Sequence, residues 1–158
     1  MTAAVMSSFT LLNAASAEDI HTAILGAWVL SDWSVTGQDG SVVQPYGPNA
    51  EGMIMYTADG QMAVQMADPS ATDEGTGLIE DRYFAYYGTY VIDEDAGTVT
   101  HSLEGSLTPS WIGTKQVRAY ELTDQDQLKL VAIIPPDDAL AEVVGAGGKN
   151  TLVWVRPD

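Results

Sequence analysis

The chain has 158 residues, enough for one domain with a hydrophobic core and too few for two domains of ordinary size. Its formal charge of −16, from 22 acidic and 6 basic residues, repels phosphates and anionic lipid headgroups, so we expect neither nucleic acid nor membrane as a partner. The absence of Cys excludes disulfides and thiolate sites, and two His exclude a three-histidine zinc site, so we expect no metal.

The first 23 residues form a lead ahead of the first expected strand. Their mildly apolar stretch ends in Ala-Ser-Ala, a pattern that suits signal peptidase cleavage after Ala17, but the basic residues of a secretory signal are missing. Two expectations stay open. The protein is exported to the periplasm or the medium, or it is cytoplasmic and residues 1–23 form a short helix or a disordered lead.

Residues 24–158 consist of short apolar or alternating segments separated by turn signals, without a long segment of helical periodicity. This pattern predicts one all-β domain. We expect eight strands, at residues 24–35, 52–57, 61–66, 86–92, 98–107, 114–122, 128–134 and 151–156. Eight strands in simple succession favour an antiparallel up-and-down barrel, which has no open edge. A sandwich of two sheets has the same spacing and stays open as an alternative.

The connections between these strands carry weaker signals. Ala58-Asp59-Gly60 predicts a tight hairpin between the second and third strands. One helical turn is expected within residues 78–84, and a short helix within residues 139–144, although glycines follow it closely.

The fifth and sixth expected strands show no cleanly apolar face. Strict alternation places His101, Leu103, Gly105 and Leu107 on one face of the fifth strand, with Glu104 on the other. In the sixth strand one face carries Gln116, Arg118, Tyr120 and Leu122. Isolated polar groups on an inward face are typical of a strand that lines a ligand cavity.

Several ordered motifs resemble the bacterial and fungal lipocalin-like domain family. LGAWVL contains the Gly-x-Trp signature of lipocalins, and it is followed by QPYGP, GMIMYTADGQM, YYGTYVIDEDAGTVTH, LEGSLTPSWIGTKQVR and LVWVR. The resemblance runs from Ile24 to Arg156 and implies a small β-barrel with a central pocket. Similar barrels bind apolar ligands, and a few related proteins are cyclases or isomerases of natural-product pathways, so the resemblance implies the fold rather than one activity.

His101 and Arg118 are the candidate polar anchors of such a pocket. A histidine that titrates near neutrality is a candidate general acid or base, so His101 is the candidate catalytic residue, although a structural hydrogen bond is the commoner role. Arg118 could bind an acidic ligand group, but we favour an ion pair with Glu104 on the neighbouring strand.

Aromatic and methionine side chains complete the expected pocket, because they are apolar, adaptable and, in Tyr, able to form hydrogen bonds. Ordinary packing of the sheet explains the same residues and stays open. The expected lining is Met53, Met55, Tyr56, Tyr86, Tyr87, His101, Trp111, Arg118 and Tyr120. Of the other tryptophans, we expect Trp28 to pack as the floor of the barrel, at the end opposite Trp111, and Trp33 to be exposed at a rim.

Three functions follow as hypotheses. The first is binding of a small, largely apolar or aromatic molecule inside the barrel, the second is a cofactor-free cyclase or isomerase acting on a polyketide-like or terpenoid-like substrate, and the third is a protein interaction module. No nucleophile elbow, phosphate-binding loop, dinucleotide motif or HExxH occurs, so we expect no cofactor. The sequence does not indicate the ligand or the oligomeric state.

Overall fold

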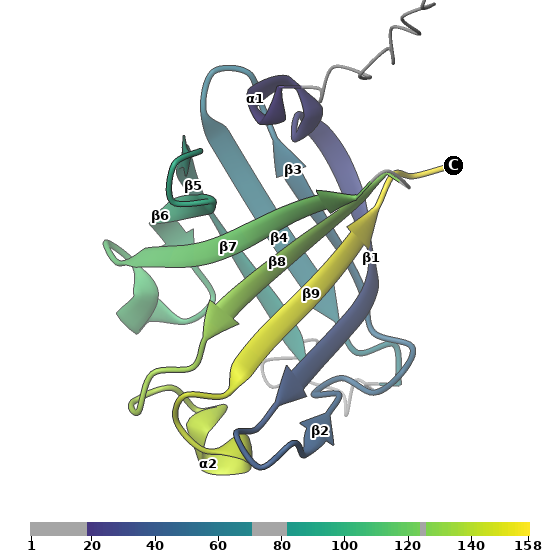
Figure 1. Ribbon diagram of the computed structural model, residues 1–158, viewed down its shortest axis with the longest axis vertical. Helices are drawn as coiled ribbons and strands as arrows, with labels where there is room; N and C mark the ends of the chain where they lie inside the picture. The colour runs from purple at the N-terminus through teal and green to yellow at the C-terminus, as the bar shows by residue number, and fades with distance from the viewer. Residues whose placement is uncertain (1–18, 71–81, 124–125) are drawn as a thin grey trace, which may run out of the picture.

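The computed structural model describes residues 19–70, 82–123 and 126–158, and it is built almost entirely from antiparallel strands (Figure 1). The strands are β1 (Gly26–Thr36), β2 (Val42–Val43), β3 (Glu51–Tyr56), β4 (Gln61–Ala67), β5 (Tyr83–Asp93), β6 (Thr98–Ser106), β7 (Lys115–Thr123), β8 (Gln127–Ile133) and β9 (Lys149–Val155). The helices are α1 (Ile20–Ala23), the 3-10 turn η1 (Pro109–Trp111) and α2 (Ala141–Val144).

A single sheet closes on itself to form the barrel. Its order is β2-β1-β3-β4-β5-β6-β7-β8-β9, and β9 pairs back onto β1. The two-residue strand β2 pairs only with the end of β1, so the closed wall consists of the other eight strands. The predicted eight-stranded up-and-down barrel is confirmed, and the two-sheet sandwich is excluded because closure leaves no second sheet.

The first strand changes phase at a bulge. Trp28 and Leu30 point inward and are buried, and the pairing with β9 then shifts between Leu30 and Asp32. A bulge inserts one extra residue, so the residues facing inward after it are Trp33 and Val35. The prediction that Trp33 is exposed at a rim is therefore wrong: its indole Nε1 donates to Asn150 Oδ1 at 2.8 Å, and the side chain is 8% exposed.

A second bulge, between β5 and β6, explains another difference. Tyr87 pairs with Gly105, but the next residue, Gly88, pairs with Leu103, so Glu104 is the extra residue. His101 and Leu103 face the interior as expected, whereas Gly105 lies beneath the ring of Tyr87 on the outer face. Leu107, expected on the same face as His101, is exposed.

The α1 end of the barrel is closed by packing around Trp28. Its indole Nε1 donates to the carbonyl of Ile24 at 2.8 Å, and the Arg156 guanidinium lies over its ring at 3.6 Å. Arg156 also donates to the carbonyls of Leu25 and Ala23 at 2.7 and 2.6 Å. The predicted role of Trp28 as the floor agrees with this arrangement.

The shorter elements lie at opposite ends of the barrel, with α1 at one end and α2 beside β2 at the other (Figure 1). The predicted helix within residues 139–144 is confirmed as α2. Most of the helical turn expected within residues 78–84 falls outside the described residues, and its last two, Tyr83 and Phe84, begin β5. Within the described chain, the helices are all too short to span a membrane.

Candidate functional site

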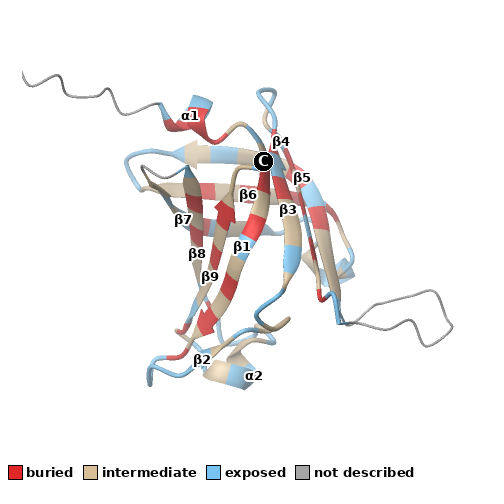
Figure 2. Ribbon diagram, turned by 90° about the vertical axis from the view of Figure 1, so that its right-hand side faces the viewer, coloured by how far each residue is buried: buried red, intermediate tan, exposed pale blue. Residues whose placement is uncertain are grey.

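The barrel interior contains a cavity of about 840 Å³ that is partly open to solvent. Buried positions alternate with less buried ones along the strands (Figure 2). The cavity wall is mostly aromatic and aliphatic, and it includes Trp33, Ile54, Val64, Met66, Phe84, Tyr86, Trp111, Leu130, Leu152 and Trp154. At one end the cavity reaches η1 and residues 134–140, on the side of the barrel away from α1. Alternation along the strands therefore produces an apolar interior that is not filled by side chains.

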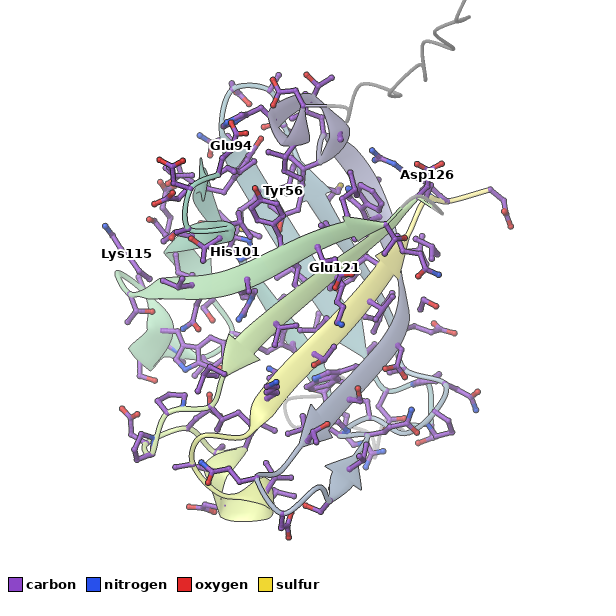
Figure 3. The ribbon with its side chains drawn as sticks, in the orientation of Figure 1. Tyr56, Glu94, His101, Lys115, Glu121 and Asp126 are labelled. Carbon is purple, nitrogen blue, oxygen red and sulfur yellow. The ribbon has the colours of Figure 1, made fainter. Side chains whose placement is uncertain are left out.

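A chain of four hydrogen-bonded polar side chains begins at the wall of this cavity, which Arg118 and Tyr86 line, and continues behind it to His101 and Tyr56. Tyr56 on β3 and Tyr86 on β5 place their hydroxyl oxygens 2.8 Å from Nε2 and Nδ1 of His101 on β6, respectively. Arg118 on β7 donates from Nη2 to the Tyr86 hydroxyl at 3.4 Å. All four are buried, and Figure 3 shows Tyr56 and His101 inside the barrel. We call Tyr56, His101, Tyr86 and Arg118 the polar cluster.

Burial and charge shift the pKa values in the polar cluster. Desolvation, and secondarily the positive charge of Arg118, hold the pKa of His101 well below its ordinary value. Desolvation likewise raises the pKa of Tyr56 well above its ordinary value. His101 and Tyr56 are therefore both neutral at physiological pH. Because tyrosine hydroxyls occupy both ring nitrogens of His101, neither nitrogen is open to abstract a proton from a molecule in the cavity.

The expected ion pair between Arg118 and Glu104 does not form. The β6–β7 pairing ends at Ser102 opposite Lys115, and it places Arg118 opposite Val99. Arg118 points inward from this position, whereas Glu104 is exposed on the outer wall. Within the described residues Arg118 has no carboxylate within ion-pair distance, so its charge is available to the cavity.

Trp111 lies over the cavity from η1. Its ring packs edge-to-face against Phe84 at 5.4 Å and against Tyr86 at 6.5 Å, measured between ring centroids. The expected position of Trp111 in the pocket agrees with this geometry. Because η1 is a short turn between β6 and β7, the ring is carried by a connection rather than by the barrel wall.

The structure brings some of the predicted pocket residues together and separates others. Tyr86, Trp111 and Arg118 line the cavity, and Tyr56 and His101 lie directly behind Tyr86. Tyr120 is half-buried against the core outside the cavity lining.

The remaining predicted residues lie elsewhere. Met55 and Tyr87 are on the outer face, 39% and 58% exposed. Successive side chains of a strand point to opposite faces, and the preceding residues, Ile54 and Tyr86, point inward. Met53 lines a separate hollow of about 470 Å³ beside the start of β3.

Several cavity residues were not predicted from the sequence. Trp33, Leu152 and Trp154 line the cavity. The alternation of β9 contained the signal for Leu152 and Trp154, which share its buried face. Trp33 is placed by the bulge in β1, for which the sequence has no clear signal.

One group of side chains outside the barrel has the composition of a metal site. Among the described residues, ligand atoms of Asp19, His21 and Glu94 lie within 4.8 Å of one another, and all three residues are exposed. His21 Nε2 is 3.0 Å from Glu94 Oε1, so this contact joins the α1 end of the chain to the β5–β6 turn. An exposed group of this kind is common without an ion, and we assign it no metal.

Comparison with known proteins identifies the family. The family model for the lipocalin-like domain matches residues 25–156. A curated relative, the 4'-hydroxy-3'-methoxypropiophenone carrier protein ppsC of Aspergillus oryzae, is 31% identical over 91 residues, which covers 54% of this chain and 77% of the relative. The family match and the cavity in the barrel support small-molecule binding in general. The chain therefore belongs to the lipocalin-like domain family.

Proposed function

We propose that this protein binds one small, largely apolar or aromatic molecule inside its barrel, and that aromatic ketones are the class to test first. The observation that carries the proposal is the cavity of about 840 Å³, whose mostly apolar wall is interrupted by a few buried polar groups. Small-molecule sites are typically roughly 300–1,000 Å³ in volume and have this composition.

The shape of the wall supports an aromatic ligand. Phe84, Tyr86 and Trp111 form a set of edge-to-face contacts at the end of the cavity near η1. Rings packed in this way present faces and edges to which a further aromatic ring can add. Burying the apolar surface of such a ligand contributes about 25 cal/mol per Å².

Two further observations favour a neutral ligand with an oxygen acceptor. The net charge of −16 opposes the approach of an anion, and the charges of Asp137 and Asp138 in the cavity lining offset that of Lys115. Inside, Arg118 and the Tyr86 hydroxyl supply hydrogen-bond donors. The curated relative is named as the carrier of an aryl ketone, which combines an aromatic ring with a carbonyl acceptor.

The test is a titration of the purified protein with 4'-hydroxy-3'-methoxypropiophenone, followed by tryptophan fluorescence and by calorimetry. Trp33, Trp111 and Trp154 line the cavity, so we expect strong quenching at a stoichiometry of one and a micromolar dissociation constant. Mass spectrometry of the recovered ketone is expected to show it unchanged. A converted product would instead support the cyclase or isomerase hypothesis.

A matched pair of variants locates the binding. Ala132 lines the cavity, whereas Ala119 is exposed on the outer face of β7. Ala132→Trp places an indole ring in the cavity and is expected to weaken binding by about tenfold or more, while Ala119→Trp is expected to keep the wild-type affinity. Thermal melting verifies that both variants fold. An unchanged affinity of Ala132→Trp, or no binding by the wild type, contradicts the proposal for this class of ligand.

A further inference from the structure

The polar cluster contains more donors than acceptors, and this imbalance determines where each hydrogen lies. Tyr56 Oη is 2.8 Å from His101 Nε2, Tyr86 Oη is 2.8 Å from His101 Nδ1, and Arg118 Nη2 is 3.4 Å from Tyr86 Oη. Each tyrosine has one hydrogen to donate, the guanidinium only donates, and a neutral imidazole donates from one nitrogen and accepts at the other.

Tyr56 determines the tautomer of His101. Tyr56 is 1% exposed and does not line the cavity, and within the described residues its hydroxyl bonds only to His101 Nε2. If Nε2 carried the hydrogen, the Tyr56 hydroxyl hydrogen would be buried without an acceptor, which is costly. Tyr56 therefore donates to Nε2. His101 is neutral, because burial and the nearby Arg118 both oppose its protonation, so its hydrogen is on Nδ1.

The same reasoning leaves the Tyr86 hydrogen without an acceptor in the protein. Nδ1 of His101 donates to Tyr86 Oη, and Arg118 donates to the same oxygen. In both contacts the Tyr86 oxygen is therefore the hydrogen-bond acceptor. No described residue accepts a hydrogen bond from the Tyr86 hydroxyl itself. Unlike Tyr56, Tyr86 lines the cavity. An acceptor for its hydrogen must therefore come from the contents of the cavity.

We propose that the Tyr86 hydroxyl is the specificity-determining hydrogen-bond donor of this barrel, and that it binds the carbonyl oxygen of an aromatic ketone. This inference rests on the proposed function and names the group that recognises the ligand. Two donors on the Tyr86 oxygen polarise its O–H bond and strengthen it as a donor. His101 and Tyr56 are positioning residues, because they act on the ligand only through Tyr86.

The first experiment compares two ligands that differ only at the carbonyl. The ligands are 4'-hydroxy-3'-methoxypropiophenone and 2-methoxy-4-propylphenol, which lacks the carbonyl oxygen, and the proteins are the wild type and Tyr86→Phe. We expect Tyr86→Phe to weaken ketone binding about tenfold and to leave binding of the carbonyl-free compound unchanged. Tyr87→Phe, whose hydroxyl is on the outer face of the same strand, is the control and keeps the wild-type affinities.

The second experiment observes the hydrogen bond directly. A ketone labelled with ¹³C at the carbonyl is expected to show a lower carbonyl stretching frequency when bound to the wild type, and a frequency close to that in apolar solvent when bound to Tyr86→Phe. If Tyr86→Phe does not fold, 3-fluorotyrosine at position 86 keeps the side chain and makes its hydroxyl more acidic. It is expected to tighten ketone binding and to lower the carbonyl frequency further.

The third experiment needs no ligand. Nitrogen-15 NMR of the free protein is expected to show His101 with a protonated Nδ1 and an unprotonated Nε2, with His21→Gln removing the other histidine signal. A protonated Nε2, or ketone affinity and carbonyl frequency unaffected by Tyr86→Phe, overturns this inference and leaves the proposed function standing. If neither compound binds the wild type, the proposed function fails, and the proposed role of Tyr86 in recognising a ketone fails with it.

Discussion

His101 shows how a single residue takes its role from its surroundings. Each of its ring nitrogens lies 2.8 Å from a tyrosine hydroxyl, and the side chain has no exposed surface. A histidine inside a predicted barrel is a candidate general acid or base. Here His101 instead forms hydrogen bonds with two tyrosine hydroxyls from different strands. Its chemistry is that of a fixed neutral donor and acceptor.

The buried, neutral state of His101 predicts a loss of stability in mild acid. Below about pH 6.5 the unfolded chain binds a proton at this residue. The native state does not, because burial and Arg118 depress the pKa of His101. The free energy of unfolding therefore falls as the pH is lowered from about 6.5 toward the native pKa, by up to about 1.4 kcal/mol per pH unit.

Urea unfolding at pH 7.5, 6.5 and 5.5 measures this effect. His101→Gln is expected to be less stable than the wild type at pH 7.5, since the tyrosines lose a partner, but to show a shallower pH dependence. His21→Gln removes an exposed histidine and is expected to retain the wild-type decline. Equal slopes for the wild type and His101→Gln would mean that His101 is already protonated in the native state.

At the scale of elements, the two bulges determine which side chains reach the cavity. The β1 bulge turns Trp33 inward, and the β5–β6 bulge turns Gly105 outward beneath Tyr87. The second bulge brings the backbones of β5 and β6 so close that a Cβ at Gly88 would lie 2.0 Å from the carbonyl oxygen of Ser102. Glycine at this position is therefore a condition for the β5–β6 pairing that keeps the Tyr86 hydroxyl within hydrogen-bond distance of His101.

Gly88→Ala is expected to destabilise the protein by about 3 kcal/mol, because the clash is with backbone and cannot be relieved by a rotamer change. Gly97→Ala is the control, since a Cβ there meets no atom within 4 Å and only its φ of +63° is unfavourable. That cost is about 1 kcal/mol. Thermal and urea unfolding of both variants measure the difference. Equal losses of stability in the two variants would mean that β5 and β6 can move apart to accommodate the Cβ without a cost in free energy.

At the scale of the whole molecule, closure of the barrel stabilises the folded state, whereas the net charge destabilises it. Pairing of β1 with both β3 and β9 leaves no strand edge in the barrel wall, which favours one compact state. The net charge of −16 is confined to a smaller volume in that compact state, so self-repulsion opposes folding. Within the described residues only two Lys or Arg side chains pair with a carboxylate, Arg82 with Asp68 and Lys129 with Glu121, so the repulsion between acidic groups is weakly compensated.

The midpoint of thermal unfolding should therefore rise with ionic strength. The Debye length falls from about 30 Å at 0.01 M to about 10 Å at 0.1 M salt, which screens the repulsion between surface carboxylates. We expect a rise of about 3 °C over this range, equivalent to about 1 kcal/mol. Sodium and potassium chloride at equal ionic strength should have the same effect. A midpoint that is independent of salt, or that depends on which cation is used, would exclude general screening as the cause.

The fold could be predicted from the sequence because each strand is encoded within a few residues. Alternating segments and turn signals such as Ala58-Asp59-Gly60 indicate where strands begin and end, and simple succession indicates an up-and-down barrel. The inward positions of His101 and Arg118 also follow from alternation. These properties depend on neighbouring residues in the chain, so tertiary structure is not needed to infer them.

The site could be predicted only in part, because it depends on pairing between distant segments. Tyr56, Tyr86, His101 and Arg118 come from four strands, and their contacts depend on the cross-strand register. The bulges alter the phase of alternation without a clear local signal, which is why Trp33 and Gly105 differ from expectation. The sequence by itself determined the strands and their order. Only the tertiary structure decided which side chains meet inside the barrel, because register and closure are set by contacts around the whole barrel wall.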